Sequence, residues 1–219
     1  MKQEFQKRIF SSIILIPIAL YFIIKGSIFF TFFISICLLI TLYEWHMMSK
    51  KRSYYIGGLI FILISFYTVF LLRNYDRYTN IPDPGLTFFL IVTLICVFTD
   101  LGGYIFGKIF KGPKLTKISP NKTYAGMFGG FFLSIISVNL FVSYNSLNLN
   151  FTNQLFIFVI LVSATSQIGD ILISFFKRKS KIKNTGKLIP GHGGLLDRID
   201  GMLFAFPLSY ILILIGLVY

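Results

Sequence analysis

Three aspartates in the second half of the chain have the type and spacing needed for metal-assisted chemistry on phosphates. Asp197 and Asp200 stand three residues apart, just before the last apolar run, and Asp170 lies inside the preceding apolar run. Two carboxylates at positions i and i+3 can converge on one divalent cation, and Mg²⁺ prefers a few carboxylates together with phosphate oxygens. The spacing therefore predicts Asp170, Asp197 and Asp200 as metal ligands and catalytic residues.

Each of these aspartates also has a purely structural interpretation. Asp197 and Asp200 suit the first turn of a helix, where the helix dipole favours negative charge. On a helix, Asp170 shares a face with Ser166 and Ser174, and such a stripe can make a polar contact between helices. However, a carboxylate at the centre of a membrane span costs about 2.5–3.5 kcal/mol, so such residues usually face a partner, a cavity or a metal.

The aspartates are accompanied in sequence by groups that suit phosphates. The stretch 174–200 carries Lys177, Arg178, Lys187 and Arg198 among its basic residues. Arginine binds phosphate through paired hydrogen bonds, and lysine acts as a point charge. The turn at 190–194, P-G-H-G-G, has little side-chain bulk, so its amides can approach a phosphate closely, although such a turn is also a common flexible connection.

A second basic loop lies between two other apolar runs, at about residues 107–123. The positive charge usual on the cytoplasmic side of a membrane explains lysines such as Lys108 and Lys111. Lys122 differs, because it lies between a Ser-Pro turn and the next apolar run, where it can neutralise a phosphate. Glu44, by contrast, ends an N-terminal apolar run beside Trp45, and we do not assign it to the site.

The composition places this chemistry in a membrane. The chain of 219 residues is 55% hydrophobic, 18% aromatic and 13% charged, and a soluble domain cannot bury so much apolar surface. The net charge of +13 does not indicate a nucleic-acid partner, because the basic residues lie between apolar runs. Cys37 and Cys96 lie within apolar runs and lack the spacing of a disulfide framework or a zinc site.

The apolar segments predict an all-α polytopic membrane protein with about seven transmembrane helices. Most of the 21 Lys and Arg residues fall in every second connection, which predicts a cytoplasmic N-terminus and an active site on the cytoplasmic side. No small-x-small cleavage site follows the first segment, so we expect a retained anchor instead of a signal peptide. The segments cover about residues 10–24, 27–43, 54–72, 85–106, 124–143, 151–176 and 201–218.

Taken together, these motifs resemble the phosphatidate cytidylyltransferases, also called CDP-diglyceride synthases. The longest motif runs from Ser174 to Asp200 as S-x2-K-R-x4-K-x2-G-x3-P-G-H-G-G-x2-D-R-x-D. Two further blocks fit, D-L-G-G-Y to S-P-N-K-T at 100–123 and S-Q-x-G-D at 166–170. The resemblance covers about residues 100–201, whereas the first ninety or so residues match only in hydropathy.

The chain departs from the family pattern at four positions. Asn184 and Ala125 stand where acidic residues are usual, Leu101 replaces Thr or Ser, and Gly103 replaces Ala. A catalytically inactive relative that serves as a membrane scaffold is therefore an alternative. The aspartates at 170, 197 and 200 are all retained.

The resemblance implies the reaction of CTP with phosphatidate to give CDP-diacylglycerol and diphosphate, a step of phospholipid biosynthesis. It also implies Mg²⁺ as cofactor, with K⁺ as a second cation. Lys187 joins the three aspartates as an expected catalytic residue. The residues expected to bind the substrates are Asp100, Lys122, Ser174, Lys177, Arg178, His192, Gly193, Gly194 and Arg198.

We expect a multi-pass protein of the inner (plasma) membrane, where CTP arrives from the cytoplasm and phosphatidate from the bilayer. A single membrane domain, 1–219, is predicted, with N-terminal helices of weak similarity at 1–99, the motif region at 100–201 and a last helix at 202–219. The sequence leaves open whether two copies form a homodimer.

Rival functions fit the sequence less well. A CDP-alcohol phosphotransferase requires the pattern D-G-x-x-A-R, which the chain lacks. An anion transporter is disfavoured, because the polar residues gather on one side of the membrane and no internal repeat is visible. A cytidylyltransferase that acts on a different lipid phosphate remains an alternative, since the acceptor pocket cannot be deduced from the sequence.

Overall fold

The computed structural model is all-helical, as the hydropathy pattern predicts. It describes residues 2–76, 81–116, 119, 121–144, 151–186 and 193–218, with side chains from residue 13 onward. In chain order, the helices of this part are α1 (Lys2–Lys25), α2 (Ser27–Ser49), α3 (Tyr55–Arg73), α4 (Pro84–Phe110), α5 (Tyr124–Tyr144), α6 (Asn153–Lys179), α7 (Leu196–Ile199) and α8 (Met202–Leu214).

The chain is a polytopic membrane protein. Within the described residues, α2, α3, α4, α5 and α6 are long and apolar enough to cross a membrane. The segments Ile13–Lys25 in α1 and Met202–Leu214 in α8 are apolar but shorter. Each of the seven predicted segments thus corresponds to a helix, and five of them meet the length and hydropathy of a span.

Some boundaries differ from those predicted. Helix α4 continues to Phe110, beyond the predicted end at residue 106, and ends before Gly112-Pro113, a pair that a helix does not readily continue through. Asp100 therefore lies well inside α4. The short helix α7 was not predicted, and it carries Asp197.

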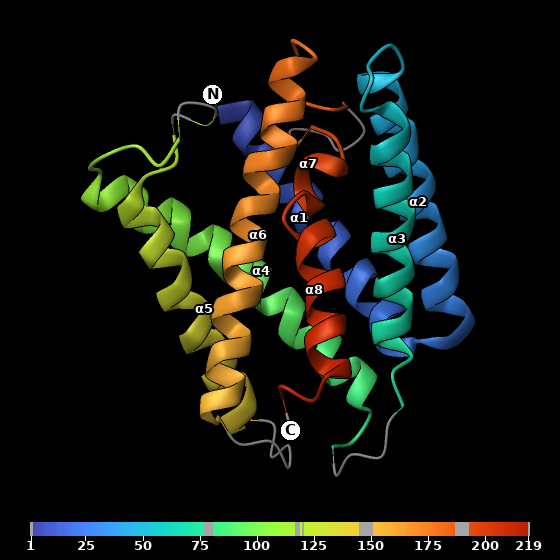
Figure 1. Ribbon diagram of the computed structural model, residues 1–219, viewed down its shortest axis with the longest axis vertical. Helices are drawn as coiled ribbons and strands as arrows, with labels where there is room; N and C mark the ends of the chain where they lie inside the picture. The colour runs from blue at the N-terminus through green and yellow to red at the C-terminus, as the bar shows by residue number, and fades with distance from the viewer. Residues whose placement is uncertain are drawn as a thin grey trace. The chain divides into compact units, whose positions relative to one another are not determined.

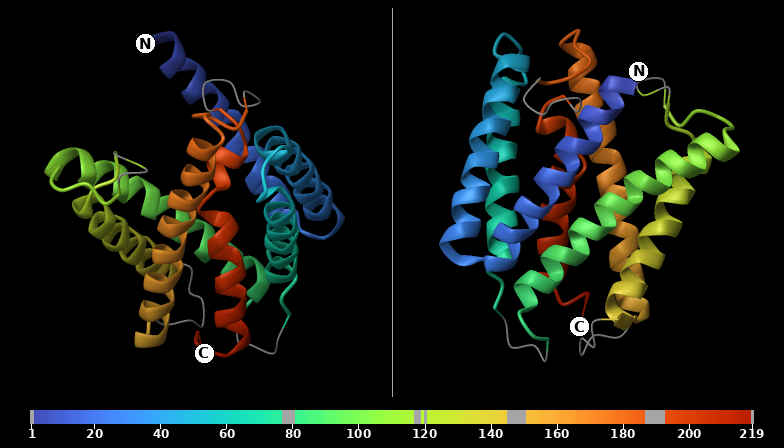
Figure 2. Two further views of the ribbon diagram at one scale, coloured as in Figure 1. Left: turned by 45° about the horizontal axis from the view of Figure 1, so that its top comes forward. Right: turned by 180° about the vertical axis from the view of Figure 1, so that it is seen from behind.

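The chain divides into two compact units, and we describe each by itself. The first unit comprises Met1–Phe70 and Phe176–Ile199, so it holds α1, α2, α7, most of α3 and the last turn of α6. In this unit α2 and α3 form a hairpin whose arms lie side by side in both orientations of the ribbon (Figures 1 and 2). Helix α1 packs on α2, where the rings of Phe22 and Phe33 stack at 5.4 Å.

Trp45 fixes the α2–α3 hairpin. Its indole Nε1 donates a hydrogen bond to the Tyr55 carbonyl at 3.0 Å, and only 2% of the residue is exposed. Gly58 leaves room for the indole ring, because a Cβ at that position would overlap it. The rings of Tyr54 and Phe176 complete the cluster, which joins the hairpin to the end of α6.

The second unit comprises Leu71–Phe175 and Asp200–Tyr219, and its central feature is the close contact of α4 with α5. A Cβ on Gly102 would overlap the Gly129 carbonyl, and a Cβ on Gly126 would lie 2.6 Å from the Gly103 carbonyl. Small residues allow helix backbones to approach closely inside membranes, where apolar burial gives little driving force between helices. The glycines therefore explain why these two helices meet at this point.

Other helices of the second unit attach to α4. The Thr99 and Ser163 hydroxyls are hydrogen-bonded at 2.7 Å, which links α4 to α6. The rings of Phe89 and Phe206 lie 5.1 Å apart and link α4 to α8. The Asp83 carboxylate caps the start of α4 by accepting a hydrogen bond from the Leu86 amide at 3.0 Å.

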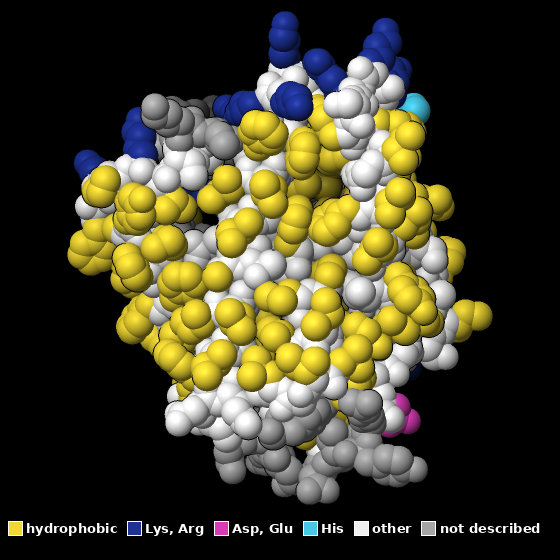
Figure 3. Space-filling view, in the orientation of Figure 1, with side chains coloured by type: hydrophobic (Ala, Val, Ile, Leu, Met, Phe, Trp, Pro, Cys, Tyr) yellow, Lys and Arg dark blue, Asp and Glu magenta, His cyan; other side chains and the backbone are white. Residues whose placement is uncertain are grey.

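The surface of the first unit separates charge from apolar side chains. Exposed apolar residues such as Leu39 and Tyr67 cover α2 and α3, and basic side chains project beyond the helix ends (Figure 3). Such a division is typical of a helix bundle in a bilayer, with lysine and arginine outside the hydrocarbon. The exposed basic residues of this unit are Lys25 at the end of α1, Lys50, Lys51 and Arg52 after α2, Arg178, Lys179, Lys181 and Lys183 at and after the end of α6, and Arg198 on α7.

Candidate functional site

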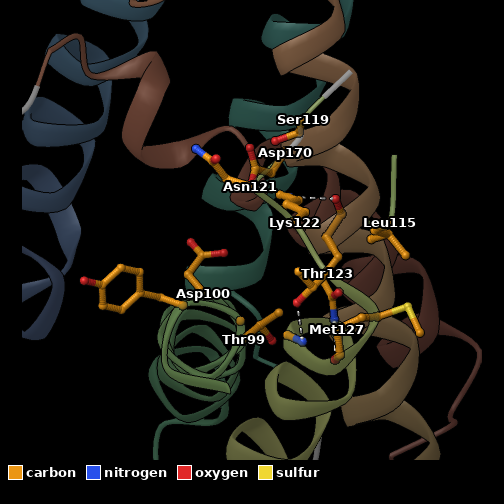
Figure 4. Close-up of a pocket in the computed structure, with 13 residues that line it drawn as sticks. Thr99, Asp100, Leu115, Ser119, Asn121, Lys122, Thr123, Met127 and Asp170 are labelled. Carbon is orange, nitrogen blue, oxygen red and sulfur yellow. Dashed lines mark hydrogen bonds and ion pairs between the residues drawn. The ribbon is translucent and has the colours of Figure 1, made fainter. Parts of the chain in front are cut away.

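A polar pocket lies in the second unit, where α4 and α5 meet α6. Its volume is about 270 Å³, and it opens among helices that are otherwise apolar. Figure 4 shows Asp100 from α4 and Asp170 from α6 at this pocket, with Asn121 and Lys122 from the loop before α5. The lining residues are Thr99, Asp100, Gly103, Tyr104, Leu115, Ser119, Asn121, Lys122, Thr123, Gly126, Met127, Gln167 and Asp170.

The loop between α4 and α5 folds back on itself, and this places Lys122 at the pocket. Lys114 and Thr123 form an isolated antiparallel bridge, and the Leu115 amide donates to the Lys122 carbonyl at 2.8 Å. The Thr123 hydroxyl accepts a hydrogen bond from the Gly126 amide at 3.1 Å and so caps the start of α5. Lys122 is consequently held next to the first turn of α5, as its position after the Ser-Pro turn suggested.

Lys122 and Asp170 form an ion pair inside the pocket, and about a quarter of each side chain is exposed. The Lys122 ammonium also donates to the Gln167 carbonyl at 3.5 Å. The Ser174 hydroxyl donates to Asp170 Oδ1 at 3.4 Å, so the predicted polar face of α6 is present. The pocket thus combines a cation for phosphate with the Asp100 and Asp170 carboxylates, which suit a divalent ion.

A second charged cluster lies in the first unit, around Asp197. Lys177 Nζ lies 2.9 Å from Asp197 Oδ1, and about nine-tenths of each side chain is buried. The amides of Thr185 and Gly194 donate to Asp197 Oδ2 at 2.8 and 3.1 Å. Gly193 has a φ of +90°, and a Cβ there would lie 3.0 Å from Asp197 Oδ2, so glycine is required on both counts.

Glu44 belongs to the same cluster, although the sequence did not lead us to assign it to the site. The residue is 2% exposed, and its carboxylate accepts hydrogen bonds from the amides of Leu195 and Leu196 and from the Thr185 hydroxyl. The one signal in the sequence was an acid at the end of an apolar run beside Trp45. Its partners are more than 140 positions away, and no periodicity in the sequence indicates them.

Asp200 lies in the second unit, at the start of the last helix. It is 7% exposed, and its Oδ1 accepts a hydrogen bond from the Gly201 amide at 3.0 Å. A Cβ on Gly201 would lie 2.5 Å from the Ser166 hydroxyl, so the backbone after Asp200 passes directly against α6. Ser166 is buried, and it stands one helical turn before Asp170.

The oxygen donors of this region suit a magnesium ion. Asp170, Asp200 and the Ser166 hydroxyl are hard oxygen ligands on adjoining segments of one unit. Within the described residues, no three His, Cys, Asp or Glu side chains are grouped closely enough to hold a metal by themselves. Because Asp197 belongs to the other unit, the set of three aspartates stays a prediction.

The remaining predicted residues are placed as follows. Arg178 is exposed and its guanidinium donates to the Ile182 carbonyl at 3.2 Å, just beyond the end of α6. Arg198 is exposed on α7, and Gly194 is buried. Lys187 and His192 lie outside the described residues. Asn121 and Gln167 line the pocket, although neither was among the predicted site residues.

Comparison with known proteins gives an extensive match. The sequence profile described as the cytidylyltransferase family matches residues 6–80 and 50–215, so the match includes the N-terminal helices. A phosphatidate cytidylyltransferase of Rickettsia typhi is 33% identical over an alignment of 219 positions, which covers 95% of this chain and 92% of that protein.

The match to staphylococcal relatives is closer in identity but shorter. Proteins named phosphatidate cytidylyltransferase from Staphylococcus epidermidis and Staphylococcus aureus are 41% identical over 133 residues. These residues make up 60% of this chain and 51% of each relative, so the chain spans about half the length of those proteins.

Proposed function

The chain belongs to the cytidylyltransferase family, and on this premise we propose that it transfers the cytidylyl group of CTP to phosphatidate. The products are CDP-diacylglycerol and diphosphate. The observation that carries the proposal is the pocket in which Lys122 is paired with Asp170. This pocket lies among helices that are long and apolar enough to cross a membrane. A site of this kind admits a charged headgroup while its surroundings accept acyl chains.

The reaction joins two anions, so its main requirements are charge neutralisation and alignment. An oxygen of the lipid phosphate attacks the α-phosphorus of CTP, and the bond from that phosphorus to the oxygen bridging to the β-phosphorus breaks. Little general-base help is needed, because the lipid phosphate is already ionised at neutral pH. The leaving diphosphate carries away the electron pair of the broken bond.

We propose several basic residues as contacts for these phosphates. Lys122 stands at the pocket, and an incoming phosphate would share its ammonium with Asp170. Lys177 is buried and paired with Asp197. We assign further phosphate contacts to Arg178, Lys187 and Arg198, as the family motif implies.

We propose Asp170, Asp197 and Asp200 as the residues that would hold Mg²⁺, with K⁺ as a second cation. When bound, the ion would neutralise phosphate oxygens and stabilise the departing diphosphate. Two backbone amides and Lys177 fix the orientation of the Asp197 carboxylate.

The membrane arrangement is part of the proposal. We propose that the N-terminus and the site lie on the cytoplasmic side of the inner membrane, because the basic connections favour that orientation, and that the shorter helices α1 and α8 bring the number of crossings to seven. A single membrane domain and the formation of a homodimer both stay predictions.

The test is to incubate the purified full-length protein in detergent with CTP, Mg²⁺ and phosphatidate. We expect a CDP-lipid to form, and we expect EDTA to stop its formation and excess Mg²⁺ to restore it. A CDP-lipid that appears only when phosphatidate is replaced by another lipid phosphate would identify a different acceptor. No product with any acceptor would contradict the proposal.

A further inference from the structure

Glu44 connects the end of α2 with the segment that carries Asp197, and nothing in the family motifs includes it. Oε1 of Glu44 accepts a hydrogen bond from the Leu195 amide at 2.9 Å. Oε2 accepts from the Leu196 amide at 2.8 Å and from the Thr185 hydroxyl at 2.9 Å. One carboxylate therefore satisfies both amides at the entry to α7 and a side chain ten residues earlier.

Two glycines make room for this carboxylate. A Cβ on Gly186 would lie 2.7 Å from Glu44 Oε1, and a Cβ on Gly194 would overlap Oε2. Both glycines belong to the long motif that begins at Ser174. Their lack of side chains is explained by the approach of Glu44, so the motif is shaped around a residue that lies some 140 positions away.

The segment that Glu44 holds is the same one that fixes Asp197. Thr185 presents its hydroxyl to Glu44 and its amide to Asp197 Oδ2. Gly194 packs on Glu44 and also donates its amide to Asp197 Oδ2. Glu44 and Asp197 thus bind the same backbone segments, and a shift at Glu44 would move both amides that orient Asp197.

We propose that Glu44 is a positioning residue for the reaction, which acts through Thr185 and Gly194 to keep the Asp197 carboxylate in place. The inference rests on the proposed function, since it gives Asp197 a role toward substrate phosphates or their cation. Residues that orient a ligand in this way typically influence activity or metal affinity by roughly 10- to 100-fold.

Glu44→Gln is the most informative variant, because it preserves size and removes only charge and one acceptor. In either orientation the new NH₂ group faces a backbone amide of Leu195 or Leu196, and two donors cannot bond to each other. Thr185→Val is a second variant, which removes one of the three hydrogen bonds without changing Glu44. Tyr54→Phe is the matched control, since it removes the 2.7 Å bond to Ser180 that also tethers the hairpin to the segment after α6.

The experiment has three readouts: hydrogen exchange, which does not depend on catalysis, and kcat and the Mg²⁺ requirement, which do. Hydrogen exchange of the full-length protein in detergent reports protection of the amides at 194–197. We expect exchange there to rise about tenfold in Glu44→Gln, less in Thr185→Val, and not at all in Tyr54→Phe. We expect kcat to fall roughly 10- to 100-fold in Glu44→Gln and half-saturation by Mg²⁺ to need a higher concentration, with Tyr54→Phe close to wild type.

The outcomes separate the inference from the proposed function. Faster exchange with an unchanged kcat and Mg²⁺ requirement would show that Glu44 only stabilises the fold, and would overturn the inference while the function stands. Unchanged exchange in both variants would overturn it as well. If the wild type forms no CDP-lipid, the proposed function fails. Binding of labelled CTP with Mg²⁺ then tests the positioning role of Glu44 by itself. Weaker binding by Glu44→Gln than by Tyr54→Phe supports that role, and equal binding contradicts it.

Discussion

The ammonium of Lys177 lies 2.9 Å from Oδ1 of Asp197, and only about a tenth of each side chain is exposed. A lysine that served solely as positive charge on the cytoplasmic side would instead be exposed, as Lys179 is two residues later. Each member of this buried pair depends on the other for compensation of its charge.

Lys177→Met should therefore cost about 3 kcal/mol in the free energy of unfolding, because Asp197 is left buried with only its backbone partners. Adding Asp197→Asn should recover part of that loss, while CDP-lipid formation stays low in both variants. Thermal unfolding in detergent and the product assay measure the two effects. Lys179→Met is the control. A Lys177→Met protein as stable and active as that control would show that Lys177 contributes only positive charge at the membrane surface.

Lys122 should matter for substrate more than for stability. Its pair with Asp170 is about a quarter exposed, so Lys122→Gln should change the free energy of unfolding by less than about 1 kcal/mol. The loss of a charged contact to phosphate should raise the KM for CTP roughly ten- to a hundredfold. Steady-state kinetics at fixed Mg²⁺ measure this constant. Lys111→Gln, in the same loop but exposed, should leave it unchanged, and equal effects of the two variants would contradict the assignment.

The glycine contact between α4 and α5 should not tolerate even one methyl group. Gly102→Ala places a Cβ against the Gly129 carbonyl and should lower the free energy of unfolding by about 1–3 kcal/mol. Gly57→Ala on α3 meets no atom within 4 Å and should be neutral or stabilise by about 0.4–1 kcal/mol. Thermal unfolding of both variants measures the difference. If Gly102→Ala is as stable as Gly57→Ala, the close approach of the helices is not required.

Asp200→Asn should separate chemistry from folding. The asparagine retains a carbonyl that can accept the Gly201 amide, so the protein should insert and unfold like the wild type. It loses the charge proposed to hold the cation, so CDP-lipid formation should fall to background at every Mg²⁺ concentration. Asp76→Asn, at an exposed acid, is the control. Normal turnover by Asp200→Asn would remove Asp200 from the site.

The helices and the family could be predicted from the sequence, and the pairings inside the site could not. Long apolar runs indicate helices by length alone, and the motif from Ser174 to Asp200 indicated a family that the profile match confirms. The face shared by Asp170 and Ser174 followed from helical periodicity and is present. These features are local, so a local pattern is sufficient to reveal them.

Other features depend on segments that are distant in the chain. The hydrogen bonds of Glu44 join residues 151 and 152 positions apart, and the Tyr54 bond to Ser180 spans 126. The helix α7 has only four residues, too few to show a period. The orientation in the membrane and the three-aspartate metal site stay predictions, because they concern the bilayer, a bound ion and two separate units.

The central claim is that the α-phosphorus of CTP moves onto a lipid phosphate at this site. The most direct measurement uses CTP labelled at either the α- or the γ-phosphate, with phosphatidate and Mg²⁺, and follows which label enters the organic phase. We predict that α-label appears in lipid and γ-label is released as diphosphate, and that neither occurs with Asp200→Asn. Lipid that carries the γ-label, or no labelled lipid from the wild-type protein, would contradict the account.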